Sequence, residues 1–334
     1  MNGVIAVDYL LFFTISVVFG AAGAILAKKA SEKFETLYDI PNERSSHSLP
    51  IPRAGGSGLF FLLICLLFFN WNVRILAILT AIIAGLGLLE DIRGVSPVSR
   101  LVLQFMIVFC GVAFILPKYN LFLYWFLFMF FAVFIVWTTN LYNFMDGING
   151  IAAISGAIAF GFLGYFAYFF GGSPKIALVC VGVSGVCIGF LPFNFPKAKV
   201  FMGDVGSLGI GFLFAFIVLM LSQSFIDFIC LVSFLFMFYA DELVTMAIRI
   251  FNKENLFRAH RKHFYQILAN EKRVEHWKIS LFYALAQVLV GISVLIMREF
   301  GSLLVLVILI SYFFIFVFFN YKIRKNTLFN AISF

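Results

Sequence analysis

The sequence predicts an all-α polytopic membrane protein. Of its 334 residues, 63% are hydrophobic and only 12% are charged, whereas soluble domains carry about 25% charged residues. Many of its apolar runs are long enough for a helix to cross a hydrocarbon core of roughly 30 Å. Because these runs are continuously apolar rather than alternating, the pattern favours helices over a transmembrane barrel.

We predict about eleven transmembrane helices, of which the second is short. The expected spans are 4–27, 57–70, 73–90, 100–117, 121–139, 151–170, 175–192, 206–222, 226–248, 278–297 and 302–320.

The basic residues predict the orientation of these spans. With a periplasmic N-terminus and a cytoplasmic C-terminus, all 24 Lys and Arg except Arg74, Lys118, Lys175 and Arg298 fall in cytoplasmic segments. This asymmetry follows the positive-inside rule. The net charge of +8 is therefore explained by topology and anionic lipids, and no nucleic acid is expected as a partner. The five cysteines all lie in apolar spans, which indicates packing rather than disulfides or a metal cage.

The polar segments 28–56, 90–100, 140–150, 193–205 and 249–277 all fall on the predicted cytoplasmic face. The outer loops are only a few residues long. We find no sequence repeat and no separate soluble region, so residues 1–334 are expected to form one membrane-embedded domain. Polar loops that converge from five places suit a charged, soluble substrate.

The first polar segment runs from Asp39 to Gly56. Its three prolines exclude a continuous helix, while Gly55 and Gly56 let backbone amides approach a ligand. Arg44 and Arg53 supply charge of the kind that binds phosphate. An ordinary basic cytoplasmic loop is the alternative.

Two adjacent carboxylates, Glu90 and Asp91, end the third span. Neighbouring helical side chains point roughly 100° apart, so the two are expected to have different roles. One can face a divalent cation while the other faces a proton or the substrate. The alternative, a solvated helix end, is disfavoured because negative charge opposes the dipole at a helix C-terminus.

Asn140, Asn143 and Asp146 are spaced by three, and Gly147 and Gly150 follow. If the fifth span continues for a turn or two, the three polar side chains line one face. Such a face suits a base or a sugar, and Asp146 could reach a metal or a ligand N–H group. The alternative is a glycine-rich turn capped by Asn and Asp.

Asp204 lies among glycines at the start of the eighth span. A helix N-terminus beside a carboxylate is typical of a seat for Mg²⁺ and diphosphate, because the metal offsets the repulsion between carboxylate and phosphate. The alternative is a plain helix N-cap.

His260 and His263 lie three residues apart among Arg258, Arg261 and Lys262. Without carboxylates or thiolates they would be poor zinc ligands, but they would contact phosphate oxygens well. A merely basic loop is the alternative.

Taken in order, these five segments resemble the polyprenyl-phosphate N-acetylhexosamine-1-phosphate transferases, the glycosyltransferase family 4 enzymes related to phospho-N-acetylmuramoyl-pentapeptide transferase. The resemblance runs from Asp39 to Gln266. The loop Arg-Ala-His-Arg-Lys-His-Phe-Tyr-Gln is more similar to the branch that initiates O-antigen and teichoic acid than to the murein-precursor branch. One departure is Glu90, where the family usually has Asp.

The resemblance implies transfer of N-acetylhexosamine-1-phosphate from a UDP-N-acetylhexosamine to undecaprenyl phosphate, with release of UMP. The product would initiate a cell-surface polysaccharide. The resemblance implies Mg²⁺, with Mn²⁺ as a substitute, held by Asp204 and Asp91. It also implies membrane lipids as partners and a bacterial inner membrane with the site on its cytoplasmic face, and it leaves a homodimer open.

The same resemblance assigns roles to individual residues. The implied catalytic residues are Glu90, Asp91, Asp204 and His260. The implied substrate-binding residues are Asn42, Arg44, His47, Arg53, Asn140, Asn143, Asp146, Asn149, Asn194, Arg261 and His263.

Two other functions are weighed against this one. A secondary transporter for an anionic nucleotide or a lipid-linked sugar would need polar groups near the middle of the membrane. Here the main intramembrane exception is Asp241-Glu242, about two turns from the cytoplasmic end of its span. A non-catalytic scaffold is disfavoured because it would not need the metal-type carboxylates.

Overall fold

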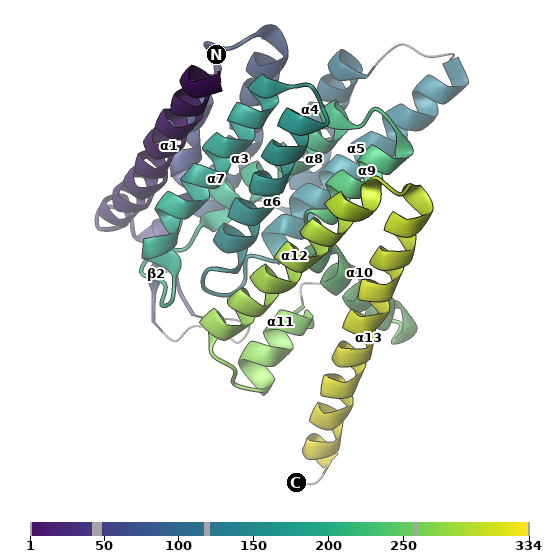
Figure 1. The fold of residues 1–334 in the computed structure, drawn as a ribbon. Helices are drawn as coiled ribbons and strands as arrows, with labels where there is room; N and C mark the ends of the chain where they lie inside the picture. Colours follow the sequence, from purple (N-terminus) through teal and green to yellow (C-terminus); the bar gives the residue numbers. More distant parts are fainter. Residues whose placement is uncertain (1, 42–48, 117–120, 257–259, 333–334) are drawn as a thin grey trace.

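The structure is a computed structural model that describes residues 2–41, 49–116, 121–256 and 260–332. Three predicted substrate-binding residues, Asn42, Arg44 and His47, lie outside the described residues. Figure 1 shows a bundle of helices with the two ends of the chain at opposite ends of the bundle.

The helices follow one another in a single bundle with one two-stranded sheet. The strands β1 (Tyr38–Asp39) and β2 (Ile51–Pro52) pair antiparallel. The helices are α1 (Asn2–Ser31), η1 (Glu35–Leu37), η2 (Gly55–Ser57), α2 (Gly58–Leu66), α3 (Trp71–Arg93), α4 (Pro97–Ile115), α5 (Leu121–Phe144), α6 (Ile151–Phe169), α7 (Pro174–Asn194), α8 (Gly203–Leu221), α9 (Phe225–Ser233), α10 (Phe236–Phe251), α11 (Phe264–Gln266), η3 (Ile267–Glu271), α12 (His276–Arg298) and α13 (Ser302–Ile332).

In the described part of the chain, nine helices are long and apolar enough to cross a membrane. The pair α9 and α10 makes a tenth candidate span, but it is bent by 86°. The class predicted from the sequence, an all-α integral membrane protein, is therefore confirmed, whereas the count of eleven is not.

The predicted second span is not among these candidates, because its apolar helix, Gly55–Leu66, is shorter than the others. The nine residues of α2 rise only about 14 Å, which is less than half of the hydrocarbon core. Arg74 of α3 closes the end of this short helix, because its guanidinium donates to the carbonyls of Leu67 and Phe69. A cation at a helix C-terminus is favoured by the helix dipole.

The most buried span is α8, which packs against α3 and α5. Two other segments, α3 and η2, approach the N-terminal turn of α8 closely, and each does so at a glycine. A Cβ at Gly87 of α3 would lie 2.3 Å from the carbonyl oxygen of Asp204, and one at Gly56 would lie 2.4 Å from the Cα of Gly206. Small residues allow helices in a membrane to approach in this way. The start of α8 is therefore fixed between α3 and η2.

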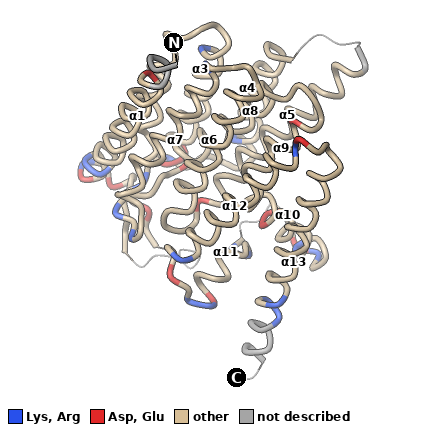
Figure 2. Tube along the Cα trace, in the orientation of Figure 1, with Lys and Arg blue, Asp and Glu red and all other residues tan. Residues whose placement is uncertain are grey.

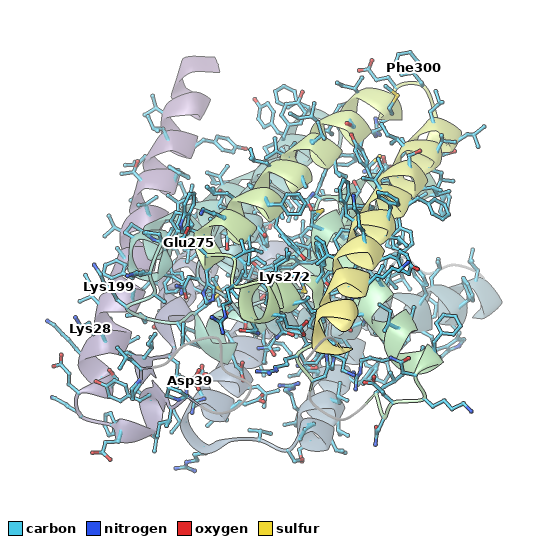
Figure 3. All side chains as sticks on the ribbon, turned by 90° about the horizontal axis from the view of Figure 1, so that it is seen from below. Lys28, Asp39, Lys199, Lys272, Glu275 and Phe300 are labelled. Atoms are coloured by element: carbon cyan, nitrogen blue, oxygen red, sulfur yellow. The ribbon has the colours of Figure 1, made fainter. Side chains whose placement is uncertain are left out.

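The charged residues gather at one end of the bundle. Figure 2 shows most Lys, Arg, Asp and Glu residues in the half that carries the C-terminus. Figure 3 looks onto this end, where Lys28, Asp39 and Lys199 come from three separate segments and Lys272 and Glu275 from the connection between η3 and α12. This is the end that the sequence predicts to face the cytoplasm.

Candidate active site

Asp91, in the last turn of α3, caps the N-terminus of α8. It is 2% exposed, and its two carboxylate oxygens accept the N–H groups of Asp204 at 3.2 Å and Val205 at 3.1 Å. These are two of the four N–H groups that a helix leaves free at its start. The contact holds α3 against α8 and uses a lone pair of each Asp91 oxygen, so Asp91 is already engaged in capping.

Asp204 does not cap its own helix. It is the second residue of α8, and its Oδ1 accepts a hydrogen bond of 2.6 Å from the Nδ2 of Asn143 at the end of α5. The same Asn143 nitrogen lies 2.9 Å from the Oγ of Ser207. The alternative of a plain N-cap is therefore not what the structure contains, and Asp204 and Asn143 form a contact between two helix ends.

Glu90 is not a solvated helix end either. Its Oε1 accepts a 2.7 Å hydrogen bond from Nη1 of Arg100 in α4, and the two side chains are 18% and 11% exposed. Its Oε2 is buried without a hydrogen-bond partner among the described residues. The carboxyl group of Asp204 lies close enough to interact with it. A buried carboxylate oxygen without a donor is unfavourable unless a cation or a proton meets it.

Asp146 lies just beyond the end of α5, because that helix ends at Phe144. Its pKa is raised well above the usual value, first because the carboxyl group is desolvated and then because Asp204 and Asp91 are near. Three carboxyl groups thus lie close to one another here and repel one another when they are ionised. A divalent cation would offset that repulsion.

Asn140 lies apart from these carboxylates. It is buried, and its Nδ2 donates to Oε1 of Gln104 in α4 at 2.6 Å and to the carbonyl of Val136 at 2.8 Å. The predicted face therefore divides. Asn143 and Asp146 join the carboxylate cluster, whereas Asn140, one turn earlier in α5, bonds to Gln104 of α4.

Asn149 and Asn194 tie two loops together. The side chain of Asn194 accepts the N–H of Gly150 at 2.6 Å and donates to the carbonyl of Val200 at 3.0 Å. The side chain of Asn149 donates to the carbonyl of Pro196 at 3.3 Å. These amides make contacts within the protein that hold the loops after α5 and α7 in place.

Arg53 follows β2 and is half-buried. One of its guanidinium nitrogens, Nη2, donates to the carbonyl of Thr36 at 3.2 Å. Its positive charge acts on Asp91, so the first polar segment meets the carboxylate cluster here.

The histidine loop follows α10. Arg261 is exposed, His260 is partly exposed and His263 is buried. The rings of His260 and His263 lie 4.9 Å apart. Burial, together with His263 and Arg249, lowers the pKa of His260 to about 4. His260 is therefore neutral near pH 7.

The tautomer of His260 follows from its hydrogen bond. Its Nδ1 lies 3.3 Å from the backbone N–H of Lys262 and accepts from it. The proton of the neutral ring then belongs on Nε2, which becomes a donor. His260 can thus donate one hydrogen bond to a phosphate or sugar oxygen without carrying a positive charge.

Tyr265 joins the histidine loop to the loop of Asp146. Its hydroxyl donates to the carbonyl of Phe144 at 2.8 Å. A Cβ at Gly147 would lie 2.2 Å from that hydroxyl, so glycine is required there. The carboxylate cluster and the histidine loop are consequently neighbouring parts of one site.

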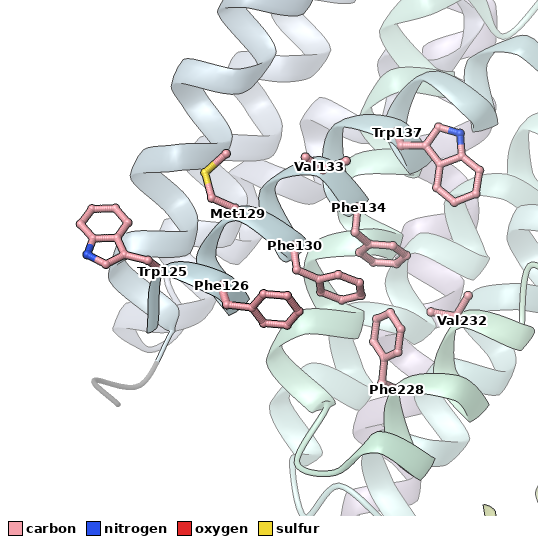
Figure 4. Close-up of a pocket in the computed structure, with 9 residues that line it drawn as sticks. All are labelled: Trp125, Phe126, Met129, Phe130, Val133, Phe134, Trp137, Phe228 and Val232. Carbon is pink, nitrogen blue, oxygen red and sulfur yellow. The ribbon is translucent and has the colours of Figure 1, made fainter. Parts of the chain in front are cut away.

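An apolar groove lies between α5 and α9. Its volume is about 1140 Å³, and aromatic rings and aliphatic side chains line it (Figure 4). Trp137, at one end of the lining stretch of α5, is six residues before Asn143, a rise of about 9 Å. The groove accordingly offers a path for a hydrocarbon chain towards the carboxylate cluster.

The cluster suits a cation that takes oxygen ligands. No three His, Cys, Asp or Glu side chains within the described ranges form a metal cage by themselves. Mg²⁺ does not need one, since it usually keeps several waters and binds one or two carboxylates together with substrate phosphates. Asp204 and Oε2 of Glu90, which accepts no hydrogen bond within the described part of the chain, offer such a pair.

Several residues of the site do not stand out in the sequence as functional. Arg100 is there only one of the basic residues that fit the topology, and Gln104 and Tyr265 belong to no numbered prediction. Asp241 and Glu242 stand out only as an exception to the distribution of charge. Their signal was present, since ionisable residues inside an apolar span mark function by default.

Comparisons with known proteins show what this chain is similar to. Residues 73–222 match the model of the family Glycosyl transferase family 4. A phospho-N-acetylmuramoyl-pentapeptide-transferase of Wolbachia sp. subsp. Drosophila simulans is 34% identical over 162 residues, which are 42% of this chain and 49% of the relative. One of Microcystis aeruginosa is 35% identical over 185 residues, 48% of this chain and 51% of the relative.

A longer match of lower identity extends this picture. A phospho-N-acetylmuramoyl-pentapeptide-transferase of Campylobacter jejuni is 26% identical over 304 residues, 76% of this chain and 84% of the relative. The chain spans about half the length of the first curated relatives that it matches. The comparisons support glycosyl transferase family 4 as the class that the five motifs resemble. The family match contains Glu90, Asp91, Asn143, Asp146 and Asp204 and ends before the histidine loop.

Proposed function

We propose that this protein transfers N-acetylhexosamine-1-phosphate from a UDP-N-acetylhexosamine to undecaprenyl phosphate at the cytoplasmic face of a bacterial inner membrane. The observation that carries the proposal is the meeting of Asp204, Glu90 and Asn143 at the N-terminus of α8, with Asp91 bound to the first amides of that helix. A helix N-terminus lined by carboxylates suits a diphosphate that arrives with a divalent cation.

In the proposed reaction, an oxygen of the lipid phosphate forms a bond to the sugar-bearing phosphorus. The bond from that phosphorus to the oxygen shared with UMP breaks, and UMP leaves. The number of phosphoanhydride bonds does not change, so the step is close to reversible. The protein itself forms no covalent bond in this scheme. It accelerates the transfer by positioning the two substrates and by stabilising the charge of the transition state.

Each part of the site has a proposed role. Glu90, whose Oε1 is paired with Arg100, would take the proton of the lipid phosphate. Mg²⁺, held by Asp204 with Glu90 or Asp91, would supply neutralisation of the diphosphate charge. Asn143 orients Asp204, and His260 would donate from Nε2 to a phosphate or sugar oxygen.

The lipid would enter sideways from the bilayer. The apolar groove between α5 and α9 is the support for this route, because a polyprenyl chain needs an apolar path whose end meets the polar site. The form of the histidine loop supports a UDP-sugar of the O-antigen or teichoic-acid branch as donor.

A secondary transporter is the weaker candidate. Transporters of this kind have broken helices in corresponding positions of both halves. The described residues contain one bent pair, α9 and α10, and the carboxylates gather at one end of the bundle. The transfer reaction accounts for that distribution.

The test is the release of UMP. Purified protein is incubated with undecaprenyl phosphate, Mg²⁺ and each of a panel of UDP-sugars. We expect UMP with at least one UDP-N-acetylhexosamine, and no UMP when undecaprenyl phosphate or the metal is omitted. Absence of UMP with every donor, from protein that is folded in lipid nanodiscs, would refute the proposal.

A further inference from the structure

A buried carboxylate in α10 ties three segments together. Asp241 has no exposed surface. Its Oδ1 accepts the N–H of Phe264 at 2.7 Å and the hydroxyl of Thr245 at 3.2 Å. Its Oδ2 accepts the hydroxyl of Tyr283 at 2.7 Å and the N–H of Tyr265 at 3.3 Å. Four donors thus compensate the burial of this carboxylate.

Two of these donors belong to the chain directly after His263. That histidine is the N-cap of α11, and a reciprocal pair of hydrogen bonds with Gln266 closes the turn. The His263 Nδ1 lies 3.8 Å from Oδ1 of Asp241, and its Nε2 lies 3.6 Å from an oxygen of Glu242. Both distances exceed those of ordinary hydrogen bonds. Asp241 therefore holds the backbone beside the ring rather than the ring itself.

The segment that Asp241 binds, Phe264 and Tyr265, also contacts the end of α5 beside the carboxylate cluster. The ring of His263 stacks on that of Tyr265 with centroids 5.7 Å apart and an angle of 14°. The hydroxyl of Tyr265 is bound to the end of α5, next to the loop of Asp146. A shift of residues 264–265 would therefore move the imidazole and disturb the Asp146 loop together.

A purely packing role is a poor account of this residue. An apolar side chain could fill the same place in a helix of a membrane bundle without the desolvation that a carboxylate demands. The contacts of Asp241 to two consecutive amides of the histidine loop give a reason for a carboxylate there, since one group can accept from both.

We propose that Asp241 is a positioning residue for the transfer reaction, and that its carboxylate fixes the amides of Phe264 and Tyr265 so that His263 and the Asp146 loop keep their relative places. This inference rests on the proposed function. It assigns Asp241 no contact with substrate.

The first experiment compares two variants of the full chain in nanodiscs. Asp241→Asn keeps the size of the side chain but turns one acceptor into a donor that faces N–H or O–H groups. We expect kcat to fall by about 10²-fold, the size of effect that a misplacement of about 1 Å can have. Thr245→Val is the control, since it removes the hydroxyl that lies 3.2 Å from Oδ1 of Asp241 and 3.4 Å from the carbonyl oxygen of Lys262 but leaves both loop amides bound to Asp241. We expect it to lower kcat by less than about fivefold.

A double-mutant cycle then tests the route of the effect. Because part of the effect of Asp241 passes through His263, Asp241→Asn combined with His263→Ala should lose clearly less kcat than the product of the two single losses. Losses that multiply would overturn the proposal, because they would mean that the two residues act independently.

A chemical probe makes the test independent of activity. Diethyl pyrocarbonate modifies neutral imidazoles, and mass spectrometry locates the modified peptide. In the parent protein, buried His263 should be protected while partly exposed His260 reacts. Asp241→Asn should remove the protection of His263. This readout still reports on Asp241 if no UDP-sugar yields UMP, in which case the proposed function fails and the positioning contact does not.

A second substitution covers the case in which Asp241→Asn is not recovered folded. Asp241→Glu keeps the charge and moves the acceptor oxygens by about 1.5 Å. It should lower kcat and expose His263 to modification. Parent-like kcat and parent-like protection in either variant would refute the positioning role.

Discussion

The departure at Glu90 offers the sharpest test of the chemistry. Glu90→Gln removes the negative charge and keeps the length of the side chain, whereas Glu90→Asp keeps the charge and shortens the side chain by one methylene. The structure places Arg100 on one oxygen of Glu90 at 2.7 Å, and the other oxygen has no hydrogen-bond donor among the residues that the structure describes. The two substitutions therefore separate the charge of this residue from its reach.

The magnitudes differ between the two changes. Loss of a general base lowers turnover by about 10²- to 10⁴-fold, which corresponds to about 3–5 kcal/mol of barrier. Glu90→Asp withdraws the carboxylate by about 1.5 Å, so its contact with Arg100 lengthens from 2.7 Å to about 4 Å. At an effective dielectric of 20, the pair weakens by about 2 kcal/mol, and partial exposure of the two side chains reduces this to about 1 kcal/mol.

The assay is UMP release from parent, Asp and Gln proteins at saturating substrates. We expect the order parent, then Asp within about tenfold, then Gln at least about a hundredfold lower. Thermal unfolding in the same nanodiscs checks that each variant is folded. If Gln turns over like the parent, the carboxylate at position 90 has no chemical role, and Asp91 or the ionised lipid phosphate must provide the nucleophile.

Three further predictions concern the metal, the pH dependence and the topology. Asp204→Asn should abolish transfer while the protein stays folded in membranes; near-native turnover with Mg²⁺ would leave Asp204 only a structural contact. Because the folded-state pKa of His260 is lowered to about 4 from an ordinary value of about 6.5, the unfolded state takes up its proton first, and stability should fall as the pH drops from about 6.5 to 4. In His260→Gln this part of the decline in melting temperature should be absent, and an unchanged pH profile would contradict the assignment. Reporter fusions after Lys33 and Lys199 and at the C-terminus should report cytoplasm, and one after Lys118 the opposite side; a periplasmic C-terminus would mean an even number of passes.

The sequence alone predicted the class and the chemistry-bearing segments. Composition and the length of the apolar runs were sufficient for an all-α membrane protein, because hydrocarbon admits only backbone whose hydrogen bonds are satisfied internally. Polar side chains are unfavourable inside such a bundle, so the segments around Glu90, Asn143 and Asp204 were visible as exceptions. The lengths and bends of the helices were harder to predict from the sequence. Nothing local shows that α2 ends after nine residues or that α9 and α10 bend by 86°.

Only the tertiary structure decided how the polar residues are shared between the site and the scaffold. The sequence shows that Asp91, Asn140 and Asn194 are polar, but not that Asp91 caps α8, that Asn140 bonds to Gln104 or that Asn194 joins two loops. Such contacts join residues between 36 and 114 positions apart. The local sequence shows the periodicity of a segment and which side chains are costly to bury. The hydrogen-bond partner of a buried polar side chain depends instead on the packing of the whole bundle, because that packing decides which helix termini lie next to one another.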